Sequence, residues 1–256
     1  VGAGNVPVIV DSSADLADAA EKIRASKTFD NATSCSSENS LVIVDAVYDD
    51  MIAALQNEGA WLLDDVEKQT LQEALWENGH LSRQVIAQSA AKIAGIAGIL
   101  RKGQPEPSML MVEESGVGAD FPFSDEKLSP VLTIYRATDF DQAFEKVRQI
   151  LEFKGKGHSV GIHSSDDEHI MRIGLEMPTC RVIVNQAHCF ATGGSFDNGL
   201  PFSLSMGCGS WGGNSIADNM NYRHFLNTTR IARRITPVQP SDEDIFSDFW
   251  KKHDIA

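Results

Sequence analysis

The fold is decided by the stretch Val6-Pro7-Val8-Ile9-Val10-Asp11-Ser12-Ser13, in which an apolar run of strand length passes into a helix-capping sequence. β-Branched residues dominate the run, which predicts a short buried strand. Aspartate and serine are preferred at helix N-caps, so we expect a helix over residues 14–25. A strand that passes directly into a helix is typical of α/β domains.

The same alternation of strand and helix continues through most of the chain. Further strands are expected over residues 41–44, 108–112, 131–135, 159–163 and 181–185. Further helices are expected where apolar residues recur three and four positions apart, over residues 47–58, 66–77, 82–96, 139–153 and 166–175. This order predicts an α/β fold with a mainly parallel sheet and right-handed crossovers.

A long segment rich in glycine, serine and asparagine follows at residues 191–219. Loops of this length in a compact domain are often functional. We therefore divide the chain at residue 200. Residues 1–200 are expected to form the thiol-bearing domain, and residues 201–256 the glycine-rich loop and a tail that contacts another subunit.

Composition and charge restrict the class of protein. The 256 residues are 42% hydrophobic, enough for a sizeable core, and the net charge of -14 disfavours nucleic acid and anionic membranes as partners. No apolar run reaches the roughly 20 residues of a membrane helix. The four cysteines form no C-x-x-C pair, which indicates free thiols in the cytoplasm. The chain begins without a signal peptide. Because it opens on Val1 in place of Met and runs almost at once into an apolar strand, we expect a fragment, a processed chain or an isolated domain.

Cys35 is the strongest candidate nucleophile. It lies in a polar stretch, residues 27–40, that is expected to include a short helical segment before the next strand. A thiol at a helix N-terminus has a lowered pKa, and the same backbone N–H groups can hold an oxyanion. The alternative is a small buried cysteine that packs beside the helix.

His158 and Glu126 are further candidates, His158 just before one expected strand and Glu126 in the segment that leads into another. His158 follows a glycine-rich turn and could move a proton near neutral pH, although a histidine bonded to a carbonyl would look the same. Glu126 offers a carboxylate suited to paired ribose hydroxyls, although it could equally be a solvated surface charge.

Other thiols and imidazoles carry weaker signals. Cys208 could be a second nucleophile, but a structural role in its glycine-rich loop is favoured. His163 and His169 have no companion ligands at metal spacing, so we expect no metal site.

Five segments occur in a characteristic order. They are Gly2-Ala3-Gly4-Asn5, Lys27-Thr28-Phe29-Asp30-Asn31 with Cys35, Glu126-Lys127-Leu128-Ser129-Pro130, Gly157-His158, and Pro201-Phe202-Ser203-Leu204-Ser205-Met206-Gly207-Cys208-Gly209-Ser210-Trp211-Gly212-Gly213-Asn214-Ser215. This order resembles the CoA-acylating aldehyde dehydrogenases over residues 1–230.

The resemblance implies an aldehyde dehydrogenase-like catalytic domain with a C-terminal return segment, and a nucleotide-binding domain that is largely absent from this chain. It implies that Cys35 is the nucleophile, that His158 acts in acyl transfer, and that Glu126 holds the nicotinamide ribose. Gly4 is implied to contact the cofactor. The implied cofactors are NAD or NADP, with CoA as co-substrate and no metal. The implied partners are a small aldehyde and further copies of the chain in a homo-oligomer.

The acylating branch is favoured by a missing residue. Hydrolytic relatives place a glutamate base in a Glu-Leu-Gly-Gly type motif, and the matching place here falls at or just before Val1, where the chain shows no glutamate. Without a base that activates water, a thioester can persist until CoA attacks it. The segments at residues 185–188, 198–202 and 221–227 look most like sulfoacetaldehyde dehydrogenases.

Two other functions stay open. A hydrolytic aldehyde dehydrogenase would release a free acid whether or not CoA is present. A non-enzymatic α/β assembly module would carry an unreactive Cys35.

Overall fold

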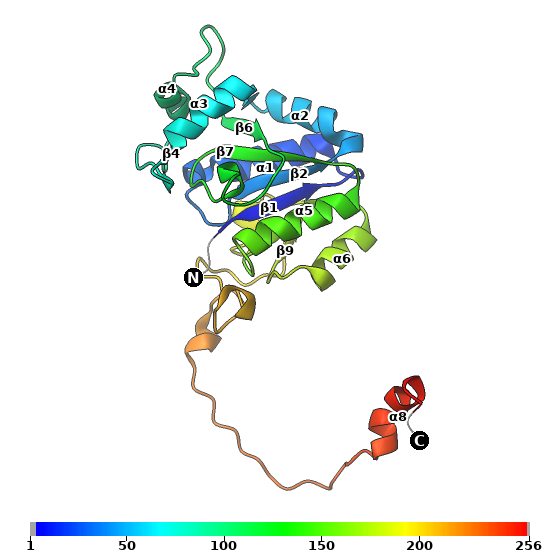
Figure 1. Ribbon diagram of the computed structural model, residues 1–256. Coiled ribbons are helices and arrows are strands. Elements are labelled where there is room, and N and C mark those ends of the chain that lie inside the picture. The colour runs from blue at the N-terminus through cyan, green and yellow to red at the C-terminus, as the bar shows by residue number, and fades with distance from the viewer. Residues whose placement is uncertain (1–3, 255–256) are drawn as a thin grey trace. The chain divides into compact units, whose positions relative to one another are not determined.

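The computed structural model describes residues 4–254, which fall into two compact units (Figure 1). The first unit ends at His224 and includes the glycine-rich segment, which the sequence had separated from it at residue 200. The second unit begins at Phe225 and contains α8 (Asp242–Lys252), a helix that the sequence did not predict. The roles assigned to the two parts of the chain stay predictions.

A seven-stranded parallel sheet forms the centre of the first unit, which confirms the α/β class and the parallel sheet (Figure 1). The strands lie in the order β3-β6-β7-β2-β1-β8-β9. Their bounds are Val6–Val10 for β1, Glu38–Val44 for β2, Ala60–Leu62 for β3, Met109–Glu113 for β6, Val131–Ala137 for β7, Val160–His163 for β8 and Val182–Val184 for β9. A separate hairpin pairs β4 (Trp76–Glu77) with β5 (His80–Leu81).

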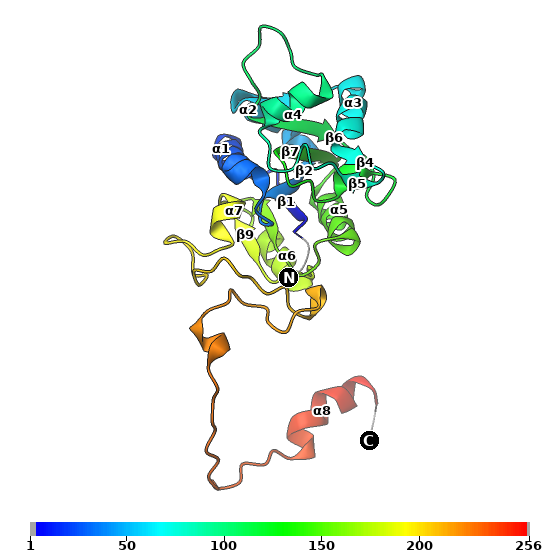
Figure 2. The same cartoon turned by 90° about the vertical axis from the view of Figure 1, so that its left-hand side faces the viewer.

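Helices cover both faces of this sheet because successive strand residues point to opposite sides. Val8 and Val10 pack against α1 (Leu16–Thr28) and α2 (Tyr48–Asn57), whereas Ile9 packs on the other face. Figure 2 shows α1 and α5 on opposite sides of the sheet. The remaining helices are α3 (Asp65–Leu75), α4 (Ala90–Ala97), α5 (Phe140–Phe153), α6 (Asp167–Glu176) and α7 (His188–Ala191).

Two element predictions were wrong in part. The helix expected over residues 82–96 exists only as α4, because the Ser89 side chain caps it at the backbone N–H of Lys92. The preceding residues form turns, and Ala87 adopts a positive φ of 60° that a helix does not allow. The strand β3 was missed because three residues carry too little alternation to detect.

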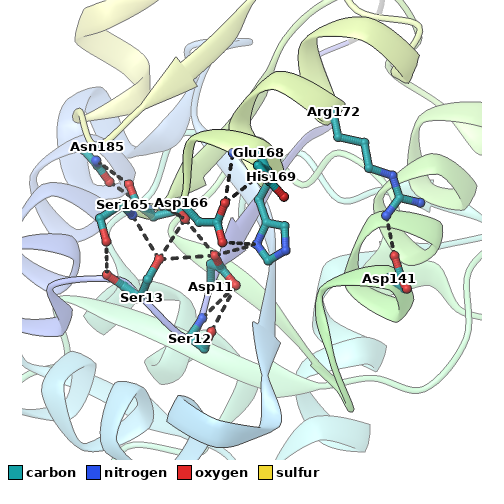
Figure 3. A network of polar contacts seen from close by, with 11 residues as sticks. Asp11, Ser12, Ser13, Asp141, Ser165, Asp166, Glu168, His169, Arg172 and Asn185 are labelled. Atoms are coloured by element: carbon teal, nitrogen blue, oxygen red, sulfur yellow. Dashed lines mark hydrogen bonds and ion pairs between the residues drawn. The ribbon is translucent and has the colours of Figure 1, made fainter.

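The Asp11-Ser12-Ser13 segment does not cap α1, which begins instead after Asp15. The Asp11 carboxylate accepts hydrogen bonds from Ser164 Oγ at 2.7 Å and lies 2.9 Å from His169 Nδ1 (Figure 3). Ser13 Oγ lies 2.9 Å from Ser164 Oγ. This network therefore joins the carboxyl ends of the adjacent strands β1 and β8.

Candidate active site

The candidate residues meet at the amino end of the central strands. Cys35 precedes β2, Gly4 precedes β1 and His158 precedes β8. These three strands are neighbours in the order β2-β1-β8, and all run in the same direction. Because parallel strands begin at one edge of a sheet, segments more than a hundred residues apart in the chain converge there.

The backbone before Cys35 forms tight turns in place of the expected helix. Asp30, Asn31 and Ala32 have φ values of 48°, 50° and 59°, which end the helical path of α1. Cys35 itself lies in a turn, in which the backbone N–H of Ser37 donates to the carbonyl of Ser34 at 3.0 Å. The prediction that the thiol lies at a helix N-terminus was wrong, because β2 begins too soon after these turns.

The expected low pKa of the Cys35 thiol is also absent. Burial raises its pKa, and the negative charge of Glu126 adds to this rise. Hydrogen bonding from Ser36 and from the backbone N–H of Cys35 acts in the opposite direction without cancelling it. The thiol is therefore mainly neutral in the resting chain.

His158 lies beside the thiol, as a functional pair requires. Its Nε2 is 3.4 Å from Cys35 Sγ, within hydrogen-bonding distance for sulfur. Burial lowers the His158 pKa to about 4, and the positive charge of Arg181 contributes to this shift. The imidazole is therefore neutral at physiological pH and carries its hydrogen on one nitrogen only.

Gly4 and Glu126 complete the surroundings of the thiol. A Cβ atom on Gly4 would lie 2.2 Å from the carbonyl oxygen of Cys35 and 2.5 Å from its Cβ, so only glycine fits there. Burial raises the pKa of the half-buried Glu126, and a hydrogen bond from the backbone of Gly4 partly opposes this. Contact of either residue with a cofactor stays a prediction.

A cavity of about 500 Å³ opens in front of the pair. Cys35 and His158 form part of its wall, and the rest comes from the glycine-rich loop and the residue after it, with Leu204, Ser205, Met206, Gly207, Gly213, Asn214, Ser215, Ile216 and Met220. This volume suits a small substrate.

Arg181 is a structural residue of the site that sequence reasoning missed. The guanidinium is buried and donates to the carbonyls of His158 at 3.0 Å and Gly207 at 2.9 Å, and to Asn219 Oδ1 at 2.8 Å. It thereby connects the histidine to the glycine-rich loop. An arginine at the start of an apolar strand was the signal that could have indicated a buried anchor.

Ser159 and His188 were also missed as companions of His158. Both are buried, and the hydroxyl of Ser159 lies between the two imidazole rings. His188 was quoted only as part of a substrate-related segment. Polar residues next to a candidate histidine are the only hint that the sequence carried.

Three other side chains that the sequence raised as candidates are not assigned a part in the reaction. Cys208 is buried, and its backbone N–H donates to Asn214 Oδ1 within the loop, which fits the structural role expected for it. His163 and His169 do not line the cavity. Across residues 4–254, no group of three potential ligands is arranged to hold a metal ion.

Two further expectations concern the position of a hydrolytic base and the absence of a membrane-spanning helix. The position that matches the hydrolytic base falls at or before Val1, outside the described residues. Within residues 4–254 no helix is both long and apolar enough to cross a membrane.

Comparison with protein families places the chain in a known group. Residues 2–199 match the aldehyde dehydrogenase family model. The chain is 57% identical to the acylating sulfoacetaldehyde dehydrogenase of Cupriavidus necator, over 98% of the chain and 51% of that relative. It is 37% identical to the acetylating succinate-semialdehyde dehydrogenase of Clostridium kluyveri, over 90% of the chain and 51% of that relative.

Solved structures give the same result. The acetylating aldehyde dehydrogenase of Geobacillus thermoglucosidasius superposes with a TM-score of 0.87 at 36% identity, covering 94% of this chain and 53% of that one. The chain thus spans about half the length of these relatives.

Proposed function

The chain belongs to the aldehyde dehydrogenase family, and on that premise we propose that it carries the thiol-bearing half of a CoA-acylating aldehyde dehydrogenase. The observation that carries the proposal is the pairing of Cys35 Sγ with His158 Nε2 at 3.4 Å in the wall of a cavity sized for a small substrate. The acylating sulfoacetaldehyde dehydrogenases among its relatives support the acylating branch and, among aldehydes, sulfoacetaldehyde as the substrate.

The first proposed step is addition of the Cys35 sulfur to the aldehyde carbon. The Cys35 thiol first releases its proton to solvent; a carbon–sulfur bond then forms as the C=O π bond breaks, and we expect the backbone N–H of Cys35 to stabilise the resulting oxyanion. Loss of hydride from that carbon leaves a thioester on Cys35. A bound NAD or NADP would supply the hydride acceptor, and the half-buried carboxylate of Glu126 fits the ribose hydroxyls of such a group.

The second proposed step is transfer of the acyl group to CoA. The CoA sulfur attacks the thioester carbon, and the Cys35 sulfur leaves as a thiolate. The expectation that His158 deprotonates CoA stays a prediction, as do the choice between NAD and NADP, the cytoplasmic location and the homo-oligomer.

A paired substitution tests the nucleophile. In a full-length protein that contains this chain, Cys35→Ala is expected to abolish acyl-CoA formation from aldehyde, nicotinamide cofactor and CoA. Cys180→Ala is the matched control, because Cys180 does not line the cavity. A Cys35→Ala variant that forms acyl-CoA at the wild-type rate would rule the proposal out.

Product analysis separates the acylating function from its rivals. The acylating enzyme yields acyl-CoA and depends on CoA, whereas a hydrolytic enzyme yields the free acid without it. A scaffold protein would yield neither product, and its Cys35 would react with alkylating reagents no faster than Cys180.

A further inference from the structure

The buried Ser159 hydroxyl bridges two histidine side chains behind the nucleophile. Ser159 Oγ lies 2.7 Å from His158 Nδ1 and 2.9 Å from His188 Nε2. From this geometry we propose that Ser159 and His188 hold His158 in the tautomer with its hydrogen on Nε2, so that His158 donates a hydrogen bond to the Cys35 sulfur. The inference rests on the proposed function of Cys35, and it makes Ser159 and His188 positioning residues.

The position of His188 is built into the fold. Its ring lies against β8, where a Cβ atom on Gly161 would come within 2.8 Å of His188 Nδ1. The glycine therefore leaves room for the imidazole beneath the sheet. His188 is 1% exposed, and its Nδ1 has no hydrogen-bond partner among residues 4–254.

Both imidazoles are neutral, which limits the possible hydrogen positions. Burial lowers the pKa of His158 to about 4 and that of His188 well below its ordinary value. Each ring then carries one hydrogen, and the Ser159 hydroxyl carries one more. The two ring nitrogens are the polar partners that the described residues offer to this hydroxyl.

Only one arrangement avoids a buried donor without an acceptor. If Ser159 donates to His188, the hydrogen of His188 must lie on Nδ1, where it has no partner. If both rings donate to Ser159, the hydroxyl hydrogen has no acceptor. If His188 donates to Ser159 and Ser159 donates to His158 Nδ1, only a lone pair on His188 stays unpaired. Buried donors without partners are rarer than buried acceptors without partners, so this third arrangement is favoured.

The favoured arrangement determines what His158 does to the sulfur. Its hydrogen lies on Nε2, 3.4 Å from Cys35 Sγ. A neutral N–H donor stabilises the thiolate and opposes the burial and the Glu126 charge that raise the thiol pKa. In this tautomer Nε2 has no free lone pair, so removal of a proton from CoA by His158 would require the opposite tautomer.

Neutron diffraction of the full-length protein after hydrogen–deuterium exchange tests the tautomer directly. We expect deuterium on Nε2 of both His158 and His188, and a Ser159 deuterium directed at His158 Nδ1. Deuterium on Nδ1 of His158 would overturn the proposal. This measurement needs no variant, so impaired folding cannot obscure it.

The pH dependence of Cys35 alkylation tests whether the positioned His158 lowers the pKa of the thiol. Removing the bridge with Ser159→Ala is expected to raise the thiol pKa and slow alkylation at neutral pH about fivefold, the equivalent of one hydrogen bond. Ser40→Ala is the matched control, because this buried serine in β2 has a hydroxyl without a partner in the described part of the chain. Identical profiles for Ser159→Ala, Ser40→Ala and the wild type would contradict the proposal.

Steady-state assays distinguish failure of this inference from failure of the proposed function. If Cys35→Ala abolishes acyl-CoA formation while Ser159→Ala leaves the thiol pKa unchanged and slows only acyl transfer to CoA, the function stands and the tautomer assignment is wrong. If Cys35→Ala keeps full activity, the function itself fails, whatever the hydrogen positions are.

Discussion

The Cys35 thiol lies in surroundings that favour its neutral form. Burial and the charge of Glu126 raise its pKa, while the helix N-terminus expected to lower the pKa is absent. Reactivity must therefore come from hydrogen-bond donors close to the sulfur, and His158 Nε2 lies 3.4 Å from it. A thiol with a raised pKa is also a stronger nucleophile once ionised.

Neutralising Glu126 is expected to lower the pKa of the Cys35 thiol and to raise the KM for the nicotinamide cofactor. Because its negative charge raises the Cys35 pKa, Glu126→Gln lowers that pKa, and the alkylation profile moves to lower pH. The same change weakens a carboxylate contact with ribose, so the KM for NAD or NADP rises. Alkylation rates between pH 6 and about 10, which spans the ordinary thiol pKa, and cofactor titrations measure the two effects. A profile that moves to higher pH would contradict the electrostatic argument.

A methyl group at position 4 is expected to displace the nucleophile. Gly4→Ala places a Cβ atom 2.2 Å from the carbonyl oxygen of Cys35, so the turn must shift. A displacement of about 1 Å at a reacting atom costs on the order of 100-fold in rate. The control is Gly174→Ala in α6, where an added Cβ meets no atom within 4 Å. Equal kcat values for both variants would show that the Gly4 contact is unimportant.

The sequence allowed Cys35 and His158 to be selected, because each lies in a recognisable motif, Cys35 in a polar stretch between a helix and a strand and His158 directly before a strand. It did not reveal the thiol pKa, which depends on burial and on a carboxylate 91 positions away in the chain. Nor did it reveal Arg181, whose partners are His158 and two residues of the glycine-rich segment. Such effects arise only when distant segments pack together.

At the scale of elements, the candidate site and the Asp11 network lie at opposite ends of the sheet. The amino ends of β2, β1 and β8 bring the thiol, the glycine and the imidazole together. The carboxyl ends of β1 and β8 are joined by the polar network around Asp11 (Figure 3). The candidate site therefore lies at one end of strands whose other end is held by the Asp11 network.

The Arg181 anchor is expected to hold the glycine-rich loop. Arg181→Lys keeps the charge but cannot reach the carbonyls of His158 and Gly207 and the amide of Asn219 together. Losing these bonds to a buried group is expected to destabilise the fold by about 2–4 kcal/mol in urea unfolding. The exposed Arg136→Lys serves as control and should change stability little. Similar midpoints for the two variants would refute the anchor.

The Asp11 network is expected to make stability depend on pH. Burial raises the Asp11 pKa, but hydrogen bonds from His169, Ser164 and the backbone of Ser12 outweigh it, so the pKa is lowered. A lowered folded-state pKa contributes stability above the unfolded-state pKa of about 4, and this is lost as pH falls through the folded value. The wild type should therefore exceed Asp11→Asn in stability at pH 7, with a difference that shrinks in acid. A difference that grows as pH falls would contradict this sign.

The elements were largely predictable because their periodicity is strong. Helices α5 and α6 lie where they were expected, with Asp139 and Asp166 as their N-caps, and β1 has the predicted bounds. The failures occurred where local pattern and tertiary structure differ. The segment before α4 has apolar spacing suited to a helix, yet it forms the end of a hairpin and turns. A three-residue strand such as β3 forms because it pairs with a neighbouring strand, and its own sequence carries too little pattern to predict it.

At the scale of the whole molecule, the chain covers about half the length of its relatives. Its first unit presents the thiol, the imidazole and a cavity, whereas a role in cofactor binding is only a prediction for Glu126 and Gly4. Aldehyde oxidation by the complete protein is therefore proposed on the basis of this unit and of its family membership.

In the proposed reaction an acyl group is held on Cys35 until CoA removes it. The most direct measurement incubates the full-length protein with sulfoacetaldehyde and NAD or NADP in the absence of CoA, then analyses its peptides by mass spectrometry. We predict an acyl adduct on the peptide that contains Cys35, which disappears with formation of acyl-CoA when CoA is added. The opposite result would be that the cofactor is reduced and free acid is released, with or without CoA, while Cys35 carries no adduct. That result would contradict a thioester on Cys35.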